Sequence, residues 1–249
     1  MYNNGHTAAQ GEPRALLAKV HAGFYRLSED LDFSIATGPE ATKKTRSQSV
    51  APIKAAIERL TDRLADLRVE IPLTGSNSST QYNAEVSYPS SLADQRETIR
   101  IEIGLREPTM TETHTGKART LLLNPVRGAP IILEFAIVSL SYQETMAEKL
   151  RAALCRREVA IRDFFDVDHA VRNAGLNTHD ASLLDLLRRK LQIEGTGPVN
   201  VSQQRREQLA AQLKAQSLPV LRPRDFAQFD LDRAFDTVAT VARAVGHDN

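Results

Sequence analysis

The chain has 249 residues, of which 25% are charged, and its formal net charge is +1. This length suits one large domain or two small ones and is sufficient for a buried core. Because the charges nearly balance, any surface that binds nucleic acid must be a local patch. The one cysteine, Cys155, excludes an internal disulfide and a cysteine-rich zinc site, and it favours a reducing compartment such as the cytoplasm. We expect no membrane span, because no apolar run is long enough, and no signal peptide.

The first strand that the sequence predicts lies within residues 25–35. Before it, residues 1–13 are polar and are expected to be disordered or poorly packed, and residues 15–20 form a short apolar segment of helical character. Between residues 25 and 35 apolar and polar side chains alternate with a period of two. Asp30 and Asp32 therefore share one face of the predicted strand.

A predicted helix separates this strand from the next ones. Residues 37–49 are polar and basic, and we expect a loop or the start of a helix there. Residues 50–67 carry apolar side chains at helical spacing, which predicts a helix. Residues 69–73 are a strand candidate, and the Gly, Ser and Asn residues within 74–80 indicate a turn.

Two further segments, residues 81–88 and 97–106, are expected to be paired strands. The second alternates, so that three isoleucines share one face and Glu102 lies on the other. Such two-faced antiparallel strands are typical of a sheet that carries helices on one side. The segments that follow are expected to be a Thr-rich loop and two strands, at residues 108–117, 119–123 and 131–140.

From Ser141 onward the apolar period becomes helical and stays helical. Ser141 and Glu144 have the spacing of a capping box, which predicts the start of the first helix. Further helices are expected over residues 159–175, 180–191, 201–216 and 224–245. The sequence thus predicts an α+β domain over residues 14–140 and an all-helical domain over residues 141–249.

Asp30, Asp32 and Glu102 are the candidate metal ligands. Two carboxylates on one face of a strand repel each other unless a cation lies between them, and Mg²⁺ takes one or two protein carboxylates together with substrate phosphates. If the strands are neighbours, Glu102 is the natural third carboxylate for two-metal phosphoryl or nucleotidyl transfer. A solvated polar face on an edge strand is the alternative for all three residues.

A second charged cluster lies on the first two predicted helices. Lys149 lies between apolar positions, from which a lysine is able to reach phosphates as a point charge. Asp163 and Asp166 share a helix face and either hold Lys149 in position or accept a proton. The alternative is a structural ion-pair network between two packed helices. His21 and His169 lack metal-ligand spacing, so we expect them on the surface or in the core.

Four sequence motifs in this order resemble one protein family. They are RLSEDLDFS at residues 26–34, IRIEI at 99–103 followed by Arg106-Glu107, ETMAEKLRA at 144–152 and RDFFD at 162–166. The chain is similar, from residue 15 to about residue 171, to the nucleotidyltransferase AbiEii/AbiGii toxin family. This family includes toxins of bacterial toxin–antitoxin and abortive-infection systems. In the helices that follow we recognise no motif.

The resemblance implies a polymerase-β-like nucleotidyltransferase core with a mixed or antiparallel sheet, followed by a helical domain. It implies that Asp30, Asp32 and Glu102 bind Mg²⁺ or Mn²⁺ and that Lys149 contacts the triphosphate. It implies further that Asp163 is a catalytic carboxylate supported by Asp166, and that Ser28 and Lys19 also bind the nucleotide. The implied partners are an NTP, a tRNA 3′ end as acceptor and a cognate antitoxin, without a membrane.

One segment departs from the family pattern. The family usually has Gly-Gly-Thr or Gly-Gly-Ser where this chain has Pro13-Arg14-Ala15. Those glycines hold phosphates through backbone N–H groups, which proline lacks, whereas the guanidinium of Arg14 is itself able to bind phosphate. The sequence therefore predicts a metal-dependent nucleotidyltransferase toxin of weakened turnover. A non-catalytic NTP-binding or regulatory protein and a kinase-like enzyme that transfers the γ-phosphate are the alternatives.

Overall fold

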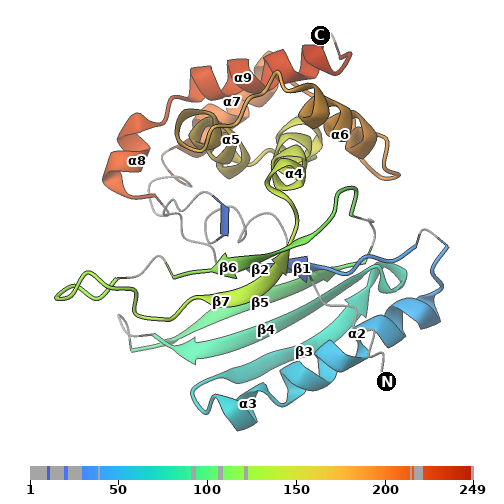
Figure 1. Ribbon diagram of the computed structural model, residues 1–249, viewed down its shortest axis with the longest axis vertical. Helices are drawn as coiled ribbons and strands as arrows, with labels where there is room; N and C mark the ends of the chain where they lie inside the picture. The colour runs from blue at the N-terminus through green and yellow to red at the C-terminus, as the bar shows by residue number, and fades with distance from the viewer. Residues whose placement is uncertain are drawn as a thin grey trace. The chain divides into compact units, whose positions relative to one another are not determined.

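The computed structural model describes residues 10–11, 20–21, 30–38, 40–90, 94–105, 109–120, 123–213, 215 and 221–247. The chain divides into two compact units (Figure 1). The first, called here the sheet unit, holds the described residues of Met1–Ala15, Ser28–Lys117 and Ala136–Leu140. The second, called here the helical unit, holds those of Leu16–Leu27, Ala118–Phe135 and Ser141–Asn249. That these units are separate domains divided at residue 140 stays a prediction.

Seven strands form one sheet among the described residues, in the order β3-β4-β5-β2-β1-β7-β6. The central strand β2 pairs in parallel with β5 and antiparallel with β1, whereas β4 pairs antiparallel with both β3 and β5. β1 in turn pairs in parallel with β7. The strands are β1 (Gln10–Gly11), β2 (Asp30–Ser34), β3 (Arg68–Ser76), β4 (Gln81–Pro89), β5 (Arg96–Gly104), β6 (His114–Ala118) and β7 (Phe135–Ser139).

One face of the sheet is apolar and packs against the helix α2 (Lys43–Glu58), which lies along β3 (Figure 1). Its core joins Val50 and Ile57 of α2 to side chains of four strands or their ends. The buried sheet residues of this core are Ile35, Leu73, Tyr82, Ala84, Ile103 and Leu105. Because side chains alternate along a strand, the intervening polar residues of β2, β4 and β5 lie on the opposite face.

The sequence predicts β2, β4 and β5 closely, and the pairing of β4 with β5 is confirmed. The helix predicted over residues 50–67 begins earlier and ends earlier. α2 begins at Lys43, within the segment expected to be a loop or helix start, and ends at Glu58, after which the four-residue α3 (Leu60–Arg63) follows. The predicted turn over 74–80 is reduced to a 3₁₀ turn at Asn77–Ser79, since β3 extends to Ser76.

The prediction for residues 108–123 is wrong in its order. A strand, β6, begins at His114 within the expected Thr-rich loop, and Arg119 and Thr120, expected in a strand, lie outside one. Threonine favours strands through its branched Cβ, so the polar composition was a misleading signal. Only Gln10 and Gly11 of the segment 1–13 are described, and they pair as β1.

The helical unit contains α4 (Tyr142–Cys155), α5 (Ile161–Asn173), α6 (Ala181–Leu191), α7 (Gln203–Gln212), α8 (Pro223–Gln228) and α9 (Leu231–Ala244). Within it, α4 packs against both α5 and α6, and α5 packs against α9. Phe164 of α5 and Phe235 of α9 stack with ring centroids 6.0 Å apart. None of the described helices is both long and apolar enough to cross a membrane.

Side-chain caps begin most of these helices. The Ser141 hydroxyl accepts from the Glu144 N–H at 3.1 Å, which confirms the serine half of the predicted capping box. The single helix expected over residues 224–245 is wrong. It is divided into α8 and α9 because Asp230 accepts from the Arg233 N–H at 2.8 Å and so caps a new helix.

Gly75→Ala is expected to destabilise the sheet unit. A Cβ at residue 75 would lie 2.9 Å from the ring of Tyr82, which is buried in the core. Forcing such a contact costs roughly 1–3 kcal/mol. Gly38→Ala is the control, because its Cβ would have no atom within 4 Å. Thermal denaturation of both variants tests this, and equal melting temperatures would contradict the crowding argument.

Candidate functional site

The polar face of the sheet brings candidate residues together in rows across three strands. In the first row, Glu85 of β4 pairs with Arg100 of β5, which pairs with Asp30 of β2. In the second row, Asn83 pairs with Glu102, which pairs with Asp32. The condition set for Glu102 as a third carboxylate is thus met, because β2 and β5 are neighbours and Glu102 lies directly opposite Asp32.

Asp32 and Glu102 form the central carboxylate pair of this face. Opposed residues on adjacent strands bring their side chains within contact range, and like charges in that position destabilise the sheet unless positive charge lies beside them. Asp32 is only 4% exposed, so water screens the repulsion between the two carboxylates less than it would at the surface. Asp30 shares the face of Asp32 but lies opposite Arg100. The three predicted ligands therefore divide into a close pair and one carboxylate across from a cation.

The donor set of this pair fits a hard divalent cation. Carboxylate oxygens are the ligands that Mg²⁺ prefers, and it usually completes its shell with water and substrate phosphates. Among the described residues, no three His, Cys, Asp or Glu side chains gather closely enough to enclose a metal ion. The pair therefore offers oxygen ligands of the kind that Mg²⁺ takes, and Asp30 lies two residues along the same strand face.

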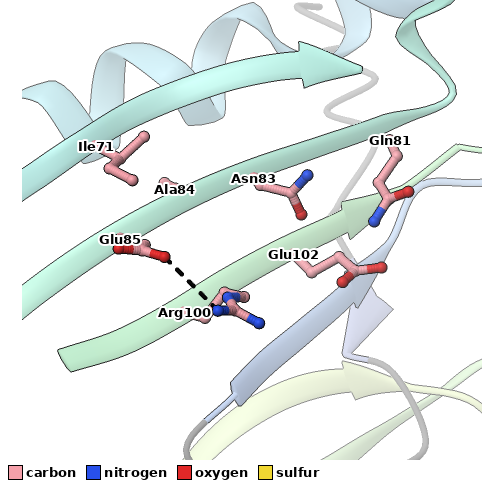
Figure 2. A pocket seen from close by; sticks show the side chains of 7 residues that line it. All are labelled: Ile71, Gln81, Asn83, Ala84, Glu85, Arg100 and Glu102. Carbon is pink, nitrogen blue, oxygen red and sulfur yellow. Dashed lines mark ion pairs between the residues drawn. The ribbon is translucent and has the colours of Figure 1, made fainter. Parts of the chain in front are cut away.

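Sequence reasoning missed three neighbours of the pair, which are Gln81, Asn83 and Arg100. Figure 2 shows them with Glu102 and Glu85 on adjacent strands β4 and β5. The Arg100 guanidinium lies 3.7 Å from the Glu85 carboxylate. A signal was present, since Tyr82, Ala84 and Val86 are buried and the residues between them are polar. That alternation already placed Gln81, Asn83 and Glu85 on one face.

In the helical unit, Lys149 and Asp166 form a buried ion pair. The Lys149 ammonium lies 2.6 Å from the Asp166 carboxylate, and their side chains are 2% and 0% exposed. This contact joins α4 to α5. The prediction that Lys149 and Asp166 are neighbours is confirmed, while their roles in nucleotide binding and catalysis stay predictions.

A second buried cation lies beside the same motif. The Lys190 ammonium on α6 is 2.9 Å from Glu144 and 2.5 Å from Glu148, both on α4. Arg151 adds an ion pair to Glu148 at 2.7 Å. The motif over residues 144–152 is therefore engaged with α6 through Lys190, a residue that the sequence analysis did not single out.

Asp163 is held near the end of α4. Its carboxylate lies 3.2 Å from the Arg156 guanidinium, and Asp163 is almost fully buried. The neighbouring Arg205 donates to the backbone oxygens of Ala153 and Arg156 at 3.0 and 2.9 Å. Arg205 thereby satisfies carbonyls at the C-terminal end of α4, and burial lowers the pKa of its guanidinium.

His169 occupies the core, as one of the two alternatives for it predicts. Burial lowers the pKa of its ring, and the nearby Arg172 lowers it further. His21 lies in ring contact with Tyr142, with centroids 5.7 Å apart. The predicted nucleotide-binding residues Ser28, Lys19 and Arg14 lie outside the described residues.

The comparisons with known proteins identify one family. The model of the family "Nucleotidyl transferase AbiEii toxin, Type IV TA system" matches residues 15–241. No curated protein matches the sequence.

The chain also matches solved structures. The nucleotidyltransferase toxin MenT4 from Mycobacterium tuberculosis H37Rv is 16% identical and superposes with a TM-score of 0.57, over 96% of this chain and 85% of MenT4. JHP933 from Helicobacter pylori is 17% identical with a TM-score of 0.49, over 96% of this chain and 82% of JHP933. The likeness to MenT4 confirms the predicted α+β fold. Because the family match spans most of the sequence, the predicted resemblance is also confirmed, and this chain belongs to the AbiEii nucleotidyltransferase toxins of type IV toxin–antitoxin systems.

Proposed function

We propose that the chain transfers a nucleotide from an NTP to an acceptor hydroxyl, such as the 3′ end of a tRNA, and that a cognate antitoxin restrains it. The observation that carries this proposal is the opposed pair Asp32 and Glu102 on β2 and β5. Family membership supports nucleotidyl transfer as the class of reaction. Membership of a type IV toxin–antitoxin family supports an antitoxin partner, whereas the tRNA acceptor comes from the resemblance alone.

Asp32 and Glu102 would hold Mg²⁺ or Mn²⁺, and Asp30 would support them from the same face of β2. The bound cation would neutralise phosphate charge and polarise the attacking and leaving oxygens. The protein's own part is to keep two carboxylates at a fixed separation. A hydrogen-bonded register provides this, because neither strand is able to slip without moving its apolar side chains out of the core.

In the proposed reaction, the acceptor hydroxyl oxygen forms a bond to the α-phosphorus of the NTP. The bond from that phosphorus to the bridging oxygen breaks, pyrophosphate leaves, and the proton of the hydroxyl passes to solvent water. Attack at the γ-phosphorus instead would make the chain a kinase, and a protein that binds NTP without turnover is the further alternative. Pro13-Arg14-Ala15, in place of the family's glycines, favours weak turnover.

Labelled ATP is expected to give product labelled from the α-phosphate and none labelled from the γ-phosphate. The acceptor in this assay is a total tRNA preparation. We expect slow transfer by the unaltered chain and faster transfer after Pro13-Arg14-Ala15 is changed to Gly-Gly-Thr, since glycine lets the backbone approach phosphate.

Label from the γ-phosphate alone would identify a kinase. Absence of label from both proteins, with NTP still bound, would identify a non-catalytic binder. Arg14→Ala is the companion variant, because a loss of transfer there would show that its guanidinium replaces the missing N–H groups.

Asp32→Asn and Glu102→Gln are each expected to abolish calorimetric binding of Mn²⁺ and Mg²⁺. Each variant removes one charge of the opposed pair, so melting temperatures without metal should hold or rise. Glu85→Gln is the matched control, because Glu85 lies on the same face but opposite Arg100. Unchanged metal affinity in both test variants would rule out this pair as the metal site.

Lys149→Met is expected to destabilise the helical unit by ~3–5 kcal/mol, because it leaves the buried Asp166 carboxylate without its cation. Adding Asp166→Leu should recover much of that loss. The exposed pair Arg189 and Asp185 offers a control, since Arg189→Met should cost less than about 1 kcal/mol.

Denaturant unfolding and an ATP titration on the same Lys149→Met protein separate two roles. A loss of ATP affinity with little loss of stability would support the contact with triphosphate that the resemblance implies. A loss of stability alone would show that Lys149 is a structural partner of Asp166.

A further inference from the structure

A hollow of about 380 Å³ lies on the polar face of the sheet beside Glu102 (Figure 2). Its polar lining comes from Gln81, Asn83 and Glu85 on β4 and from Arg100 and Glu102 on β5. Sites for small molecules usually measure about 300–1,000 Å³. Of the opposed carboxylates only Glu102 lines the hollow, which therefore flanks the proposed metal site on the side of β4.

The charge of this lining argues against a phosphate chain. Glu85 and Arg100 offset each other at 3.7 Å, and Glu102 leaves an excess negative charge. A triphosphate in the hollow would meet two carboxylates and one arginine that is already paired. A neutral ligand with hydrogen-bonding groups avoids that repulsion.

The remaining lining has the chemistry that recognises a nucleobase. Side-chain amides such as those of Gln81 and Asn83 carry both a donor and an acceptor and are able to pair with the edge of a base. The Gln81 oxygen also accepts from the Asn77 amide at 3.2 Å, which occupies one of its two lone pairs. Arg100 is 59% exposed at the side chain, and its planar guanidinium is suited to stacking on a ring. Ile71, which is 45% exposed, adds an apolar wall.

The edge strand β3 is irregular on both sides of Ile71. The pairing of β3 with β4 shifts register on both sides of Ile71, between Val69 and Ile71 and again between Ile71 and Thr74. Such β-bulges bend the strand that carries them and re-aim its side chains. Pro72 lies inside the second shift, where an edge strand tolerates the missing N–H. Ile71 is thereby set apart from a regular strand position.

We propose that this hollow binds a nucleoside, as base and ribose, next to Glu102. The nucleoside belongs either to the NTP or to the terminal nucleotide of the acceptor, and both have the same chemistry. The proposal rests on the proposed function in one respect, which is that a phosphate-bearing substrate binds at the adjacent carboxylates. The nucleoside in the hollow is inferred from the residues that line the hollow.

Binding measurements in the presence of Mg²⁺ test the proposal. The ligands are tripolyphosphate, each of the four NTPs and a short single-stranded RNA with a free 3′ hydroxyl. Asn83→Leu and Gln81→Met keep side-chain size and remove the amides. We expect about tenfold weaker binding of at least one NTP or of the RNA, with tripolyphosphate unchanged. Thr98→Val is the matched control, because Thr98 lies on the same face of β5 beyond the hollow.

Weaker NTP binding assigns the hollow to the NTP nucleoside, and weaker RNA binding alone assigns it to the acceptor. If both amide variants match Thr98→Val for every ligand, the nucleoside site is wrong. Labelled-ATP transfer separates this failure from failure of the proposed function. If labelled nucleotide is transferred and the amide variants bind every ligand normally, the proposed function is supported and the nucleoside site is contradicted. If the amide variants bind more weakly but no transfer occurs, the nucleoside site is supported and the proposed function is contradicted.

Discussion

The parallel pairing of β2 with β5 is the constraint on which the rest of the sheet unit depends. Phe33 lies opposite Ile103 and packs with the core beneath α2, whereas Asp32 lies opposite Glu102 on the other face. Because side chains alternate with a period of two, a slip of one residue would bring Asp32 into the apolar core. The hydrophobic effect on one face thus fixes the separation of two carboxylates on the other. The register between β2 and β5 thus determines both the apolar packing on one face and the proposed metal site on the other.

The charged residues of the helical unit obey a different constraint, which is the cost of burying ions. Lys149 and Lys190 are each 2% exposed at the side chain, and each lies against at least one carboxylate of a neighbouring helix. A buried charge is tolerated when it is paired and costs several kcal/mol when it loses its partner. The family motif over residues 144–152 therefore holds α4 against α5 and α6 through charges, whichever further role Lys149 has. This is the structural network that the sequence analysis kept as an alternative.

How far the sequence predicts the structure depends on whether local pattern or long-range contact decides. The alternation of apolar and polar residues around Asp32 and Glu102 is a local pattern. It correctly predicted both strands and the face of the sheet on which each carboxylate lies. The opposition of the two residues depends on which strands pair, and only the family resemblance and the structure supply that. Lys190 lies 42 residues from Glu148 in the chain, so no local pattern connects them. The break at Asp230 had a local signal, an aspartate in capping position, but the continuing apolar period obscured it.

The polar face of the sheet divides by charge, and Glu102 lies at the division. On the side of β2 it opposes Asp32, and the two together favour a cation. On the side of β4 it opposes Asn83 and borders a hollow where Glu85 and Arg100 offset each other. A ligand in the hollow and a cation at the carboxylates would therefore both contact Glu102. In the two sites proposed here, Asp32 would contact the cation alone, whereas Glu102 would contact both the cation and the neutral ligand.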